Sequence, residues 1–88
     1  MRHFSKLVSV LGLIAMASGV QASTQCTQEP KSKWMSESAM QDKVKQAGYQ
    51  IKTFKVSGSC YEIYGTDKDG KKAEVYFNPV DGAIVKSK

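Results

Sequence analysis

Two short stretches with the same order of apolar and polar residues lie on either side of a polar turn. Residues 61–64 read Tyr-Glu-Ile-Tyr, residues 73–76 read Ala-Glu-Val-Tyr, and Asp-Lys-Asp-Gly occupies residues 67–70. This pattern predicts a β-hairpin with a three-residue loop in which Gly70 takes the left-handed conformation. Because side chains alternate along each strand, the hairpin has an apolar face and a polar face. The predicted pairs are Ile63 with Val75, Tyr61 with Phe77, Glu62 with Tyr76, and Tyr64 with Glu74.

Apolar residues at helical spacing precede this hairpin. Met40, Val44 and Ala47 form one stripe, and polar residues fill most positions between them. Ser36 is a suitable N-cap residue, and Gly48 is placed to end the helix in a left-handed cap. We therefore expect a helix that begins at Ser36 and packs its apolar stripe on the sheet.

The apolar period changes toward two from Tyr49 onward, which indicates strands. The first strand should contain a bulge near Lys52 and Thr53, and further strands are expected at about residues 60–66, 72–78 and 83–85. A helix followed by strands predicts an α+β fold, with one helix packed on a small antiparallel sheet of three to four strands. The predicted core residues are Trp34, Met40, Val44, Ala47, Ile51, Tyr61, Ile63, Val75, Phe77 and Ile84.

The first 22 residues have the three parts of a secretory signal. They begin with basic residues and continue with an apolar run of about ten residues. Small or neutral residues then precede the bond after Ala22. The run is too short to span a bilayer. We predict cleavage after Ala22, export, and no stable membrane insertion after removal of the signal. The rest should form an extended N-terminal segment, residues 23–33, and a single domain, residues 34–88.

Both cysteines of the chain, Cys26 and Cys60, follow the predicted signal. A domain this small gains only marginal stability from its core, and an even number of cysteines in an exported protein favours a disulfide. Closing this loop would stabilise the fold by about 3–4 kcal/mol. A redox or metal role for the pair is the alternative, but there is no Cys-x-x-Cys, and the single histidine, His3, lies within the signal.

The charge of the chain is mildly basic. The formal net charge is +5, and it becomes +3 once Arg2 and Lys6 are set aside with the signal. No arginine remains after residue 22, although arginine is the residue best suited to phosphate and guanine contacts. Nucleic-acid binding is therefore not predicted.

Catalytic and metal-binding groups are scarce after the signal. Without a histidine, neither a Ser-His or Cys-His nucleophile system nor the usual zinc sites can be assembled. Glu62 and Glu74 form a candidate carboxylate pair, but a flat, solvated sheet face does not provide the burial that acid–base catalysis by paired carboxylates needs. The 67–70 turn fails as an EF-hand loop, because Gly65 and Tyr76 occupy positions that require a carboxylate. We therefore predict a non-enzymatic protein with no cofactor and no bound metal.

The polar face of the hairpin is the candidate partner-binding surface. It carries Glu62, Tyr64, Glu74 and Tyr76, with Thr53 predicted beside them. Tyrosine is favoured in interfaces because it combines apolar area with a hydrogen-bonding tip. The alternative is that the two tyrosines only stabilise the sheet by cross-strand contacts.

The last strand, residues 83–85, offers a second route to a partner. It is expected at the edge of the sheet, where an extended peptide could add a further strand. Lys86 and Lys88 could equally protect this edge from self-association.

The order and spacing of these features resemble the PepSY domain in its small, secreted, stand-alone form. The resemblance covers nearly all of the chain after the signal. It is carried by Trp34, the helix, Gly48-Tyr49, Cys60-Tyr61-Glu62, Asp69-Gly70-Lys71-Lys72, Glu74-Val75, Asn78-Pro79 and Asp81-Gly82.

The resemblance implies a function in peptidase regulation. PepSY domains occur in propeptides of thermolysin-type metalloproteases and in many bacterial envelope proteins, and the family is proposed to inhibit or regulate peptidases. It supplies no catalytic residues to transfer to this chain. We therefore expect a periplasmic or secreted protein that binds a protein or peptide partner in the cell envelope, with a peptidase as the leading candidate. The alternatives are a sensory or accessory module of an envelope signalling or membrane redox complex, and a small metal or ligand carrier.

Overall fold

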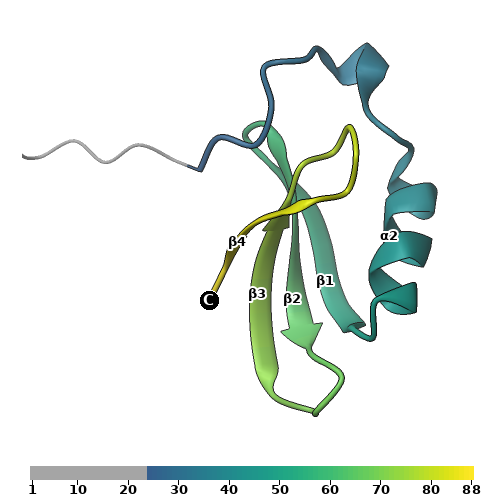
Figure 1. The fold of residues 1–88 in the computed structure, drawn as a ribbon, viewed down its shortest axis with the longest axis vertical. Coiled ribbons are helices and arrows are strands. Elements are labelled where there is room, and N and C mark those ends of the chain that lie inside the picture. Colours follow the sequence, from purple (N-terminus) through teal and green to yellow (C-terminus); the bar gives the residue numbers. More distant parts are fainter. Residues whose placement is uncertain (1–23) are drawn as a thin grey trace, which may run out of the picture.

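One helix and a four-stranded antiparallel sheet make up the fold (Figure 1). The structure, a computed structural model, describes residues 24–88. The predicted signal and its cleavage after Ala22 lie outside these residues. The elements are the 3₁₀ turn η1 (Lys31–Lys33), helix α2 (Glu37–Gln46) and strands β1 (Gln50–Ser57), β2 (Cys60–Thr66), β3 (Lys72–Phe77) and β4 (Ile84–Ser87). The strands lie in the order β1-β2-β3-β4, and the predicted α+β class is confirmed.

Helix α2 begins and ends where its sequence predicts. The Ser36 hydroxyl accepts a hydrogen bond from the Ala39 amide at 3.1 Å, as an N-cap does. Gly48 has φ of 102°, a left-handed conformation that is strained for residues with a side chain. The Tyr49 amide then donates to the Val44 carbonyl at 3.3 Å, so the chain leaves the helix directly into β1.

The β2–β3 hairpin has the predicted register. All four predicted pairs are present, from Tyr61 opposite Phe77 to Tyr64 opposite Glu74. Gly70 has φ of 80°, and the Asp67 side chain accepts from the Asp69 and Lys71 amides at 2.9 and 3.0 Å, which holds the three-residue loop. The expected bulge in β1 is also confirmed, because the register with β2 shifts between Ile51 and Thr53.

The core lies between α2 and one face of the sheet, here called the inner face. Its buried residues are Met40, Val44, Tyr61, Ile63, Val75 and Phe77, all of which were predicted. Trp34 packs its ring edge-to-face on Tyr61, with centroids 5.4 Å apart, and the Tyr61 hydroxyl donates to the Met35 carbonyl at 2.7 Å. Trp34 and Ile51 are partly buried against this cluster. The expectation that Ala47 belongs to the core is wrong, because Ala47 is the C-cap residue at the end of α2 and is exposed.

Two expectations about the ends of the domain are wrong. Ile84 was placed in the core, but 52% of it is exposed, because within residues 24–88 β4 is the edge strand of the sheet. The N-terminal segment is not extended throughout, since residues 31–33 form a 3₁₀ turn after Pro30. Across the part of the chain that the structure describes, no helix has the length and apolar character needed to cross a bilayer.

Candidate functional site

The opposite side of the sheet, here called the outer face, brings the four predicted surface residues together. Glu62 lies directly across from Tyr76, and Tyr64 lies directly across from Glu74. Strict alternation puts these four side chains on the side away from α2, because Tyr61, Ile63, Val75 and Phe77 point to the core. We call Glu62, Tyr64, Glu74 and Tyr76 the outer cluster.

Glu62 departs from the sequence expectation of a solvated outer face. It is only 1% exposed, the one charged residue among those described that is this deeply buried. Its strand is central in the sheet, and Lys55 on β1 and Tyr76 on β3 flank it on both sides. Oε1 lies 3.8 Å from Lys55 Nζ, but Oε2 is buried and has no hydrogen-bond partner among residues 24–88. A buried carboxylate with an unmet oxygen is costly, so this group requires a functional or structural explanation.

Hydrogen bonding links the other members of the outer cluster. The Tyr76 hydroxyl donates to Glu74 Oε2 at 3.1 Å. The pKa of Glu74 is lowered, first by the adjacent Glu62 carboxyl and then by the hydroxyls of Tyr64 and Tyr76. The pKa of Tyr64 rises to about 12, first through hydrogen bonding with Glu74, and that of Tyr76 rises to about 12, first through burial. The tyrosines therefore keep their protons and act as hydrogen-bond donors at neutral pH.

Two lysines from the neighbouring strands flank the cluster. Lys55 Nζ lies 5.5 Å from the Tyr64 ring centroid, and Lys88 Nζ lies 5.9 Å from that of Tyr76. Lys88 also lies 3.9 Å from Glu74 Oε1. Both lysine side chains are half exposed and both ion pairs are long, so water or a partner can displace them readily.

A broad depression continues from the cluster toward the 67–71 loop. Its volume is about 830 Å³, and Tyr64, Thr66, Lys72, Glu74 and Lys88 are among its lining residues. These five alternate to the outer face, and Ile51, Gly65 and Ala73, which alternate to the inner face, also line the depression. Tyr64 stands at its border and is 40% exposed. The outer cluster thus adjoins a concave surface with exposed hydrogen-bonding groups, as binding surfaces have.

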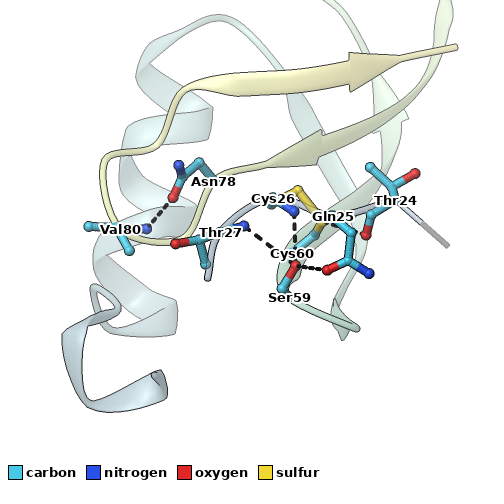
Figure 2. Close-up of a disulfide and its surroundings, with 8 residues drawn as sticks. All are labelled: Thr24, Gln25, Cys26, Thr27, Ser59, Cys60, Asn78 and Val80. Atoms are coloured by element: carbon cyan, nitrogen blue, oxygen red, sulfur yellow. Dashed lines mark hydrogen bonds between the residues drawn. A yellow bond between two sulfur atoms is a disulfide. The ribbon is translucent and has the colours of Figure 1, made fainter. Parts of the chain in front are cut away.

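The predicted disulfide between Cys26 and Cys60 is confirmed (Figure 2). The Cα atoms lie 5.1 Å apart, within the normal range for a bridged pair. The Cys26 amide donates to the Ser59 hydroxyl at 2.9 Å, and Gln25 lies beside the same hydroxyl. The bridge ties the N-terminal segment to the start of β2, next to the outer cluster.

The chemistry available at this surface is hydrogen bonding and ion pairing. Among residues 24–88, no three His, Cys, Asp or Glu side chains gather closely enough to hold a metal ion. Sequence reasoning found the four cluster residues but missed the burial of Glu62 and the role of Lys55. The two-residue turn at Gly58-Ser59 was the available signal for Lys55, because pairing Ser57 with Cys60 places Lys55 opposite Glu62.

Comparisons with known proteins place this architecture in a family. Neither the curated proteins nor the solved structures contain a match to the chain. The model of the peptidase propeptide and YPEB domain matches residues 6–88, nearly the whole chain. The residues covered by this match include the helix and the four-stranded antiparallel sheet described above, in which β2 and β3 pair in the predicted register. The chain therefore belongs to the family of peptidase propeptide and YPEB domains, the PepSY family.

Proposed function

We propose that this protein is an exported, non-catalytic module that binds a protein or peptide partner through the outer cluster and thereby inhibits or regulates a peptidase. Family membership supports a propeptide-like or regulatory role, since PepSY domains are generally non-catalytic modules of this kind. The choice of the outer cluster as the contact surface rests on its geometry.

The observation that carries the proposal is the unmet Glu62 Oε2. A partner that displaces the side chains covering this oxygen and donates a hydrogen bond to it would satisfy a buried acceptor that residues 24–88 leave without one. Exposed Tyr64 and the neighbouring depression provide contact area around it. Aromatic residues surrounding a desolvated polar group are typical of the residues that dominate binding energy.

A periplasmic or secreted location is part of the proposal. The Cys26–Cys60 bridge supports it, because disulfides form and persist in oxidising compartments outside the cytosol. The predicted signal at residues 1–22 would deliver the chain there.

Affinity capture with the exported, oxidised protein tests the proposal. The full chain is expressed with its own leader, purified after export, immobilised and exposed to an envelope extract of the source organism. We expect capture of a peptidase whose activity falls on binding, and about tenfold weaker capture by Tyr64→Ala, as for a dominant interface tyrosine. Lys45→Ala, on the exposed side of α2, is the matched control and should bind as the unmodified protein does.

Two results would contradict the proposal. Equal capture by the unmodified protein, Tyr64→Ala and Tyr76→Ala would show that the outer cluster is not the contact surface. Capture of a membrane signalling or redox protein, with peptidase activity unchanged, would instead favour the sensory or accessory role.

A further inference from the structure

Strand β4 leaves one side of its backbone unpaired. Among the strands that residues 24–88 form, it lies at the edge of the sheet and pairs with β3 alone (Figure 1). Glu74 and Lys88 exchange two backbone hydrogen bonds, of 2.8 and 3.2 Å, and Tyr76 lies opposite Lys86 in the same register. Paired and unpaired residues alternate in an antiparallel ladder, so the N–H and C=O of Ser87 point away from the sheet. This edge can accept another strand.

The side chains of β4 separate by chemistry onto the two faces. Lys86 and Lys88 lie on the outer face, opposite Tyr76 and Glu74. Lys86 has no ion-pair partner within residues 24–88. The start of the strand is apolar and open, since Ile84 is 52% exposed and Val85, the extra residue at the bulge, is 44% exposed.

The exposed Ile84 borders a hollow between α2 and the sheet edge. The hollow has a volume of about 300 Å³, and its apolar lining includes Met40, Val44, Phe77 and Ile84. Met40, Val44 and Phe77 are themselves buried, so Ile84 is the one of these four apolar residues that remains open to solvent beside the edge. An apolar side chain from an added strand would cover this hollow and remove Ile84 from water.

A second copy of this chain is a poor occupant for the edge. Two β4 strands paired antiparallel would bring the lysines of both copies together on one face, where like charges destabilise the pairing. Acidic side chains at the same positions would instead form ion pairs with Lys86 and Lys88. The charge pattern of the edge thus selects against self-association and for an acidic partner.

We propose that β4 is a docking edge for an extended partner segment in which acidic residues alternate with apolar ones. The acidic residues face Lys86 and Lys88 on the outer face, and the apolar residues face Ile84 and the hollow beside α2. The backbone of Ser87 pairs with the added strand. The inference that this edge is where the partner attaches rests on the proposed function. The ability of the edge to bind such a segment can be tested independently of it.

The test uses the exported, oxidised protein and two short capped peptides. One peptide alternates glutamate with valine, and the other alternates lysine with valine. Amide hydrogen exchange, followed residue by residue by NMR, reports strand addition directly. We expect the glutamate peptide to slow exchange at Ser87, with little change at Lys88, whose amide is already paired. The lysine peptide should have no such effect.

Two variants separate strand addition from surface charge. Ser87→Pro removes the free N–H and blocks the edge while leaving the β3 pairing intact. Because this variant has no amide to follow at residue 87, peptide binding is followed there by chemical-shift changes of the Lys86 and Lys88 amides, which should be lost. Lys86→Glu keeps the backbone and should weaken binding of the glutamate peptide by about two- to fivefold, as loss of an exposed ion pair does. Circular dichroism checks that both variants are folded. If Ser87→Pro does not fold, the result with Lys86→Glu still decides the outcome.

The inference is overturned by equal binding of the two peptides, by no protection at Ser87, or by concentration-dependent protection of Ser87 without peptide, which would show a second copy on the edge. These results are distinct from failure of the proposed function. Loss of peptidase capture in Tyr64→Ala with unchanged capture by Ser87→Pro would keep the outer cluster as the contact surface and remove the edge.

Discussion

Removal of the Cys26–Cys60 bridge is the sharpest test of what holds this small domain together. The bridge closes a loop with a sequence separation of 34 and joins a segment outside the sheet to β2. Reduction keeps every side chain in place and removes only the covalent link. The comparison of oxidised and reduced protein therefore isolates the effect of the link on the unfolded chain.

The size of the effect follows from the loop length. The chain-entropy relation for a loop of this length gives about 4 kcal/mol at 25 °C. A domain of this size has a free energy of unfolding of roughly 3–10 kcal/mol. Reduction should therefore remove a large part of the total stability, and Tm should fall by roughly 15–30 °C if the reduced protein still folds.

Urea unfolding followed by Trp34 fluorescence and by circular dichroism measures the change. Trp34 packs on Tyr61, so its emission reports loss of the core. The Cys26→Ala and Cys60→Ala double variant is the control, and reductant should not alter its unfolding. A loss on reduction of less than about 1 kcal/mol would refute the reasoning, because the loop-closure effect would then be absent.

Three further predictions concern the sheet. Glu62→Gln removes a buried charge with an unmet oxygen, so urea unfolding should show a gain of about 1 kcal/mol in stability together with weaker partner capture; a clear loss of stability would contradict this account. Because the pKa values of Tyr64 and Tyr76 are raised to about 12, their contribution to stability should be complete below pH 10 and be lost as the pH rises toward 12. Ultraviolet titration should then show Tyr64 and Tyr76, together with Tyr61, whose pKa is raised by burial, ionising later in the folded than in the urea-unfolded protein, and coincident curves would count against the cluster. Gly65→Ala places a Cβ against the Gln50 carbonyl oxygen, so the free energy of unfolding should fall by about 1–3 kcal/mol, and an unchanged urea midpoint would exclude that close contact.

Local chemistry explains why much of the fold was predictable. Ser36 and Gly48 determine the ends of α2 through contacts within a few residues, and Gly70 sets the loop that fixes the β2–β3 register. Once that register is set, alternation assigns each side chain to one face. The membership of the outer cluster and of most of the core follows from it.

Burial on the outer face and at the sheet edge was not predictable in the same way. Glu62 was expected in solvent, but its central strand places Lys55 and Tyr76 on both sides of it, and those neighbours come from different parts of the chain. Ile84 was expected in the core, but among residues 24–88 β4 is the edge strand of the sheet and Ile84 is exposed. Both errors concern which residues lie beside a strand in the sheet. The pattern of apolar and polar residues within one strand carries no information about those neighbours.

The amino-acid sequence by itself determined the helix, the hairpin register, the two faces of the sheet and the pairing of its cysteines, because each depends on short-range geometry or on a unique pair. Only the tertiary structure decided that Glu62 is buried with an unmet oxygen and that the edge beside Ile84 is open. The physical reason is that exposure depends on strand order and on atoms brought together from distant segments, and strand order is a property of the assembled sheet.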